Sequence, residues 1–360
     1  MPAPRTRGAA TEARAIRGKS RKVAVACLQN ATAFARSTTV RLADGTFAFD
    51  LQAGELGRMP VDPAFDPVVF DWDGAQMTVI DDRRRSNNLH VPEALSLLGP
   101  DTVSYGHWMA EEFPKFLTAR QVVDLKGIPI LIDADIPPQH RQSIVAFVGE
   151  NHPIITVPRN LKVTADRLWV VTNWLYSPKF LTTDRDIDVD ALAYPPTHFA
   201  NVFSKAWDDL ETLIGGVEAA RARVFVSRDP KRHRNSANHT EVLALLEARG
   251  FQDVRPGELS FLEQFRLYRS ASRVVVQAGS AATGLFMCRP GTRVCHLSQV
   301  TAMPLIPIWS ALMAGLKVDT TILLSKVAER HAIYEDFSSY TVDVAALGNL
   351  VAEWEETPFE

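Results

Sequence analysis

Two loops in the second half of the chain carry residue types that bind phosphate groups in proteins. Arg228 and Arg234 follow the apolar run VFVS, and Gly279 and Ser280 follow the apolar run VVV. Arginine makes charge-assisted hydrogen bonds to phosphate, worth roughly 1.5 to 3 kcal/mol each when partly desolvated. Glycine lets the backbone approach a ligand closely, and a helix that starts after it offers unpaired amides. The pattern predicts a site for a phosphorylated ligand, although a single loop arginine can equally be a solvated side chain.

A second candidate catalytic site is a carboxylate and an imidazole in the first half of the chain. Glu111 follows His107 by four residues, so on a helix the two side chains share one face, whereas Glu112 points elsewhere. A positioned base typically contributes ~10² to 10⁴ in rate. We interpret Glu111 as a general base that His107 orients. The alternative is a solvated carboxylate beside a hydrogen-bonded histidine on a helix surface.

The two loops with candidate phosphate-binding residues lie among short apolar runs, which alternate with amphipathic segments. The serine and glutamate of SFLE form a capping-box pattern, so a helix should begin after Ser260. Strands joined by helices form a parallel sheet, and ligands bind beyond the carboxyl ends of its strands. The expected strands are 224–227, 251–254, 274–276 and, as the last strand, 293–297. The expected helices are 203–213, 241–249, 261–271, a helix after 280, 308–315 and 344–354.

The first half is expected to hold a β-rich lead-in and a separate α/β domain. Asp44 and Gly45 form a hairpin turn signal between TVRL and TFAFD. Further elements of this half are expected as a helix that carries His107, a strand at PILI, a helix around 142–147, and strands near Ile154 and Trp169. Pro195 and Pro196 suggest the link to the second domain.

The predicted fold class is therefore α/β with several domains. The expected division is a basic, disordered arm and lead-in segment at 1–38, a β-rich lead-in at 39–88, an N-terminal α/β acceptor domain at 89–195, a C-terminal α/β donor domain at 196–330, and a helical tail at 331–360.

Composition excludes several classes of protein. The chain has 360 residues, 46% hydrophobic and 22% charged, which is long enough for two hydrophobic cores. A net charge of -3 and a pI near 6.3 argue against a nucleic-acid-binding protein. Three cysteines are too few for a disulfide framework and are typical of a reducing cytoplasm. No apolar run approaches the length that spans a membrane.

The N-terminal arm is basic. Its cations precede a moderately apolar stretch, residues 23–35, that Gln29, Asn30 and Thr32 interrupt, so we interpret it as an arm and not as a signal peptide. Such an arm could lie on an anionic membrane surface where lipid-linked acceptors occur, which leads us to expect a cytoplasmic protein with peripheral contact to the inner membrane.

Three other chemistries have only partial signals in the sequence: metal-dependent transfer, dinucleotide-dependent oxidoreduction and serine hydrolysis. Asp-x-Asp pairs occur at Asp71 with Asp73, at Asp133 with Asp135 and along 184–190, but such a short pattern arises often by chance. A dinucleotide-binding fingerprint is incomplete around Gly279, and the glycine directly before Ser280 does not fit a hydrolase nucleophile.

Several motifs together resemble a known family. The segments VFVSRDPKRHRN, NHTEVLALLEARGF, LSFLEQFRLYRSASRVVV and GSAATGLFMCRPGT resemble the C-terminal half of glycosyltransferase family 61, in its bacterial branch of capsular polysaccharide biosynthesis type. The upstream segment GHWMAEEFPKF resembles its N-terminal motif. The two matches span roughly Tyr105 to Leu297.

The resemblance implies two Rossmann-like domains of the GT-B type and inverting transfer of a hexosyl, pentosyl or N-acetylhexosaminyl group. The donor would be a nucleotide-sugar and the acceptor a glycan or glycolipid, with no metal cofactor. Ala278 and Gly284 stand where the family usually has His and Asn. The alternative is therefore a non-catalytic relative that binds a glycan or a nucleotide. The residues that fall on the family's donor-binding positions are Arg228, Arg234, Asn238, Glu263 and Gln264.

Overall fold

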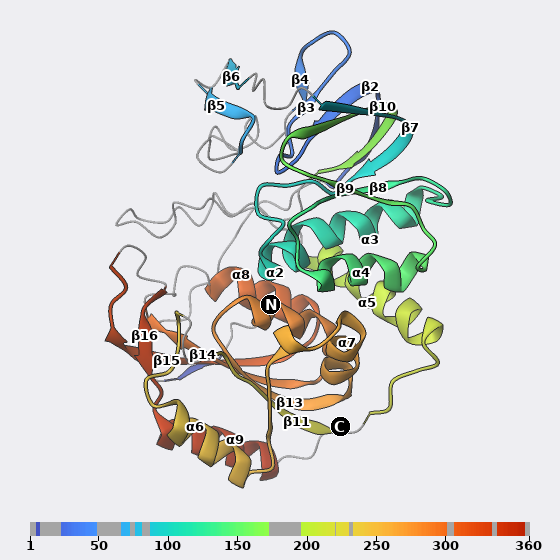
Figure 1. The fold of residues 1–360 in the computed structure, drawn as a ribbon. Helices are drawn as coiled ribbons and strands as arrows, with labels where there is room; N and C mark the ends of the chain where they lie inside the picture. Colours follow the sequence, from blue (N-terminus) through green and yellow to red (C-terminus); the bar gives the residue numbers. More distant parts are fainter. Residues whose placement is uncertain are drawn as a thin grey trace. The chain divides into compact units, whose positions relative to one another are not determined.

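The computed structural model describes residues 5–7, 23–48, 66–72, 76–80, 87–172, 196–219, 221–229, 233–300, 306–332 and 337–356 (Figure 1). It is a mixed α/β protein, as predicted. The chain divides into two compact units. Unit 1 comprises Met1–Gly18, Phe180–Asp190 and Pro196–Glu360, and unit 2 comprises Lys19–Lys179 and Ala191–Pro195.

Unit 1 is built on a parallel sheet with the strand order β1-β15-β14-β13-β11-β12, and β16 pairs antiparallel with β15. The sequence predicted four of these strands and their parallel direction. The expectation that β14 is the last strand was wrong, because the apolar run of β15 continues the sheet. The strands are β1 (Arg5–Arg7), β11 (Ala222–Val226), β12 (Gln252–Val254), β13 (Ala271–Gln277), β14 (Arg293–Gln299), β15 (Asp319–Glu329) and β16 (Ser339–Thr341).

The helices of unit 1 end close to the predicted positions, but α5 begins at Pro196 and not at 203, so one proline of the predicted link lies inside a helix. Ser260 and Glu263 form the predicted capping box at the start of α7. The helix after Gly279 is a 3₁₀-helix. The helices are α5 (Pro196–Leu213), α6 (His239–Ala248), η5 (Pro256–Glu258), α7 (Phe261–Ser270), η6 (Ser280–Met287), α8 (Ile306–Gly315) and α9 (Val344–Glu356).

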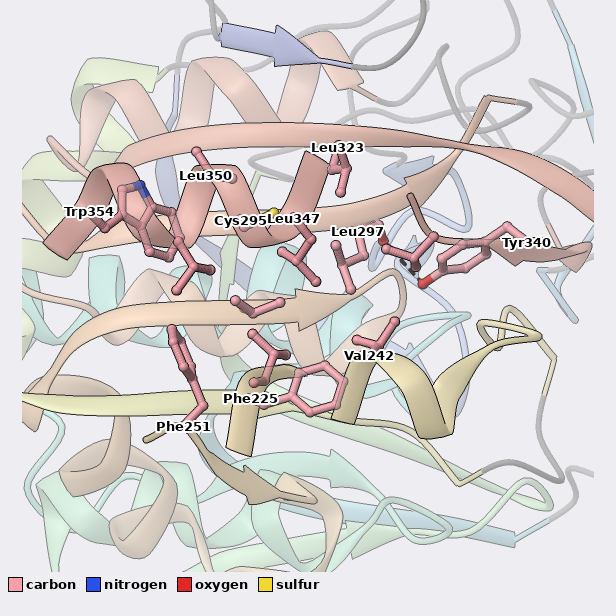
Figure 2. Close-up of a cluster of buried hydrophobic side chains, with 14 residues drawn as sticks. Phe225, Val242, Phe251, Cys295, Leu297, Leu323, Tyr340, Leu347, Leu350 and Trp354 are labelled. Carbon is pink, nitrogen blue, oxygen red and sulfur yellow. Dashed lines mark hydrogen bonds between the residues drawn. The ribbon is translucent and has the colours of Figure 1, made fainter. Parts of the chain in front are cut away.

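Helices cover both faces of the parallel sheet, as they must where both faces are apolar (Figure 1). On one face α6 and α9 pack against the strands, and Figure 2 shows Val242, Leu347 and Trp354 gathered over Phe225 and Leu297. The opposite face is covered by a group of rings in mutual contact: Phe199, Phe203, Trp207, Phe265 and Phe286. Helix α9 is thus part of the core of unit 1, although it lies in the region that the sequence assigned to a separate tail.

Unit 2 contains a mixed sheet with the strand order β4-β3-β2-β10-β7-β8-β9. Strands β10, β7, β8 and β9 run parallel, and β2 joins β10 antiparallel. The predicted hairpin is confirmed, since β3 pairs with β4 and the Asp44 carboxylate accepts a hydrogen bond from the Thr46 amide. The strands, with the separate pair β5 and β6, are β2 (Val25–Phe34), β3 (Val40–Arg41), β4 (Phe47–Ala48), β5 (Val69–Trp72), β6 (Met77–Val79), β7 (Asn87–Ser96), β8 (Ile130–Asp133), β9 (Ile154–Val157) and β10 (Leu161–Val171).

The fold of unit 2 begins earlier than expected. Strand β2 lies inside the segment 1–38 and pairs with β10. Ala31, Ala33 and Phe34 of this strand are buried, whereas Gln29 and Asn30 are exposed. Most of the basic arm, residues 8–22, lies outside the described residues, as do Pro195 of the predicted link and the aspartates between 184 and 190.

The helical part of unit 2 is one run of three segments followed by a separate helix. The run consists of α2 (Tyr105–His107), the π-helix η2 (Trp108–Glu112) and α3 (Phe113–Val122), and it confirms the predicted helix that carries His107. Helix α4 (Pro138–Val148) packs beside it. Within the described residues of both units, no helix is long and apolar enough to cross a bilayer.

Candidate functional site

The loop that holds Arg228 and the loop that holds Gly279 meet at the carboxyl edge of the unit 1 sheet. They leave the neighbouring strands β11 and β13, and the Arg228 guanidinium Nη1 donates to the Ala278 carbonyl at 2.8 Å. Gly279 has φ +148, and a Cβ built on it would lie 2.7 Å from Cζ of Arg228. Glycine is therefore required at 279 both by its backbone angle and by the guanidinium that lies over it. A cation over a glycine turn is an arrangement that can receive a phosphate oxygen.

A buried glutamine fixes the first of these loops. The Gln277 carboxamide oxygen accepts the Arg228 amide at 2.8 Å, and its nitrogen donates to the Ser236 hydroxyl at 2.7 Å. Gln277 is 1% exposed and is the final residue of β13. The sequence did not single out this residue, although a polar side chain at the end of a buried apolar strand is the signal that marks it.

Arg234 lies further along the same loop and contacts an aromatic ring. Its guanidinium carbon lies 4.4 Å from the centre of the Phe337 ring, and its amide donates to the Phe337 carbonyl. The backbone of Arg234 is left-handed, with φ 64. His233 also stacks on Phe337, so this end of the loop is a small cluster of cationic and aromatic groups.

The remaining predicted donor residues make contacts with the backbone. Asn238 bonds both the amide and the carbonyl of Val342, and so joins the start of α6 to the chain before α9. The Glu263 carboxylate caps α7, and this hydrogen bonding to Ser260 lowers its pKa. The buried Gln264 donates to the carbonyls of Pro256 and Leu259.

Packing explains why residue 284 is a glycine. A Cβ on Gly284 would lie 2.6 Å from the Tyr268 hydroxyl oxygen, so the tyrosine ring occupies the space that a larger residue would need. The Tyr268 hydroxyl donates to the Ala281 carbonyl in the same 3₁₀-helix. Ser280, at the start of that helix, is exposed.

In unit 2, His107 and Glu111 are brought together as their spacing predicts. The distance from His107 Nδ1 to Glu111 Oε1 is 2.7 Å, and the two side chains are 37% and 19% exposed. Both groups are accessible enough to meet a substrate. The geometry is that of a carboxylate whose orientation an imidazole fixes, which is suited to accept a proton.

Glu112 is a charged residue whose environment the sequence did not reveal. It forms an ion pair of 2.9 Å with Lys115, in which each side chain is only 4% exposed. Burial raises the pKa of Glu112 to about 7, and Lys115 opposes that rise. Helical spacing places Glu112 off the face of His107 and Glu111, but it does not show that this second face is buried.

The one Asp-x-Asp pair with both side chains described has a structural role at its first position. Asp133 is 1% exposed and accepts hydrogen bonds from the amides of Arg36 and Gly99 and from the Thr102 hydroxyl. Burial raises the pKa of Asp133. Among the described residues, no cluster of three or more metal-ligating side chains occurs.

These features define a class of mixed α/β protein with a glycine turn and a guanidinium at the carboxyl edge of a parallel sheet. The family model Glycosyltransferase 61 matches residues 105–295, just over half of the chain. The chain therefore belongs to glycosyltransferase family 61 and is a glycosyltransferase, which uses a sugar donor and a glycan acceptor. A comparison with curated proteins found no match.

Proposed function

We propose that this protein is an inverting glycosyltransferase that moves a sugar from a nucleotide-sugar donor to a glycan or lipid-linked acceptor in bacterial polysaccharide biosynthesis. The proposal includes two Rossmann-like domains of the GT-B type, a cytoplasmic location with peripheral contact to the inner membrane, and no metal cofactor. The observation that carries it is the Arg228 guanidinium held over the Gly279 turn.

The proposed donor site follows from that contact. The departing nucleoside diphosphate carries negative charge, which a guanidinium and the amides after a glycine turn would stabilise. Gln277 holds the Arg228 backbone and the Ala278 carbonyl accepts a hydrogen bond from its guanidinium, so this group needs little reorganisation to meet a phosphate. Ser280 would add a hydroxyl at the same turn, and Arg234 a second cation from the same loop.

The proposed base is Glu111. It would take the proton of the acceptor hydroxyl as that oxygen attacks the anomeric carbon, while His107 holds the carboxylate in one orientation. Inversion follows if attack occurs on the side opposite the departing diphosphate.

Titration calorimetry with a panel of nucleoside diphosphates tests the donor site. We expect one nucleotide to bind the unmodified protein and to bind Arg228→Gln at least about tenfold more weakly, because the variant lacks the cation. Glu111→Gln should bind the nucleotide as the unmodified protein does. Equal affinity in Arg228→Gln would contradict the assignment. Arg266→Gln is a matched control, because Arg266 is exposed on α7.

A non-catalytic relative that binds a nucleotide or glycan is the second candidate. Ala278 and Gly284 stand where the family resemblance implies His and Asn, and the Tyr268 ring leaves no room for a larger residue at 284. Measurable nucleotide binding without turnover of any nucleotide-sugar would favour this candidate.

A further inference from the structure

The helix that carries the proposed base contains an irregular turn with an identifiable cause. The Phe113 amide donates to the Trp108 carbonyl, five residues back, which is the bond of a π-helix. Pro114 follows directly and has no amide proton, so the carbonyl of Ala110 receives no bond from it. The helix widens at 108–112, and such π turns occur frequently at functional sites.

Two residues around this turn are accessible to solvent, and the residue that follows each of them is buried. His107 and Glu111 are partly exposed, whereas the residues that directly follow them, Trp108 and Glu112, are 0% and 3% exposed. Trp108 is anchored on α4, where its ring stacks on His140 with centroids 5.0 Å apart and its Nε1 donates to Ser143 Oγ at 3.0 Å. The buried pair therefore fixes the rotation of the turn about the helix axis.

Glu112 is anchored by charge and by shape. Its Oε2 accepts a hydrogen bond from Lys115 Nζ, one turn along in α3. Its other side meets Gly99, on the loop after β7, where an added Cβ would lie 3.0 Å from Glu112 Cδ and closer still to Oε1. Only glycine leaves room for the carboxylate in this position.

We propose that Glu112 and Lys115 are positioning residues, which hold the π-helical turn so that Glu111 and His107 keep the geometry needed for proton transfer. The inference rests on the proposed role of Glu111. Neither Glu112 nor Lys115 touches substrate, because both side chains are almost fully buried.

A purely stabilising role is the competing explanation, and the energetics argue against it. Burying two charges costs several kcal/mol per ion, and well-packed apolar residues of similar size often give equal or greater stability. The burial of an ion pair is therefore weak evidence that the pair serves to stabilise the fold. Here one member of the pair, Glu112, directly follows the proposed base Glu111 in the same π-helical turn.

Nitrogen NMR of the histidine rings at pH 8 reads that orientation without a substrate. The His107 signal, assigned with His107→Asn, reports whether Nδ1 is bonded to Glu111. In the double variant Glu112→Gln/Lys115→Met we expect the His107 signal to move to its position in Glu111→Gln, while helix content and cooperative unfolding persist. Lys126→Met and Glu150→Gln, which change exposed residues of unit 2, should leave the signal in place.

A second variant avoids any change of charge. Gly99→Ala should displace the Glu112 carboxylate and shift the His107 signal in the same way, whereas Gly257→Ala, which has open space around it, should not. An unchanged His107 signal in a folded Gly99→Ala or double variant would overturn the inference.

Kinetics separate this inference from the proposed function. Once a donor is identified, the double variant should lose at least about tenfold in kcat with an unchanged KM for the donor, since the proposed donor site lies in unit 1. If no nucleotide-sugar is turned over, the proposed function fails, and the His107 signal still decides whether the pair positions the turn.

Discussion

Adjacent glutamates on one helix have different surroundings. Glu111 is partly exposed and bonded to His107, while Glu112 is buried against Lys115 and Gly99. On this difference rest our proposals that the first glutamate takes part in the chemistry and that the second positions it.

The buried glutamate predicts a pH dependence of stability. Burial raises the pKa of Glu112 from 4.5 to about 7, so between these values the folded protein binds more protons than the unfolded chain. The free energy of unfolding contributed by this group therefore falls as pH rises through that window. Relative to Glu112→Gln, the unmodified protein should lose about 3 kcal/mol between pH 4.5 and 7, measured by urea denaturation. Parallel pH profiles for the two proteins would contradict the assignment.

The glycine under Arg228 predicts a second effect at the residue scale. Gly279→Ala places a side chain in a left-handed backbone and against the guanidinium, so it should cost about 1 to 3 kcal/mol of stability and weaken nucleotide binding. Denaturation and calorimetry measure the two effects. Gly257→Ala is the control, because Gly257 has open space and an ordinary φ; equal losses in both variants would refute the close packing.

Individual residues differed in how far the sequence could predict them. The contact between Arg228 and Gly279 was predictable because each follows a buried strand, and parallel strands end at one edge of the sheet. The hydrogen bonds between Asn238 and Val342 were not predictable, since the two residues are far apart in the chain and no local pattern links them. Glu112 was missed because helical spacing gives a direction but not the burial on that side.

At the scale of helices and strands, the sequence predicted those boundaries that depend on hydrogen bonds between residues close together in the chain. The capping box at Ser260 and the turn at Asp44 and Gly45 each specify a boundary through nearby hydrogen bonds. The π turn was not predictable, because Pro114 removes a bond but does not say how the helix adjusts. Strands β7 and β15 also escaped prediction, since long partly polar strands resemble other extended segments.

Helix α9 gives the prediction at this scale. Trp354 is 6% exposed and belongs to the core cluster that α6 and α9 form on the sheet (Figure 2). Trp354→Ala should lower the free energy of unfolding by about 3 to 5 kcal/mol in chemical denaturation. Leu213→Ala, at a side chain that is 61% exposed, should change it by less than about 0.5 kcal/mol. A small effect of Trp354→Ala would mean that α9 is a dispensable tail.

At the scale of the whole molecule, the family match and the structural units have different limits. The match begins at the helix of unit 2 that carries His107 and ends inside β14 of unit 1. Strand β15 and helix α9 lie beyond it, yet they complete the sheet and the core of unit 1. The sequence identified the family through motifs within the matched region, whereas the elements outside that region required the three-dimensional structure.

The most direct test of the account is release of nucleoside diphosphate from a panel of nucleotide-sugars in excess EDTA, with the unmodified protein and Glu111→Gln side by side. We predict that the unmodified protein turns over one donor despite the chelator, and that Glu111→Gln binds this donor equally but reacts ~10² to 10⁴ more slowly. Turnover at equal rates in the two proteins, or nucleotide binding without turnover of any donor, would contradict the account.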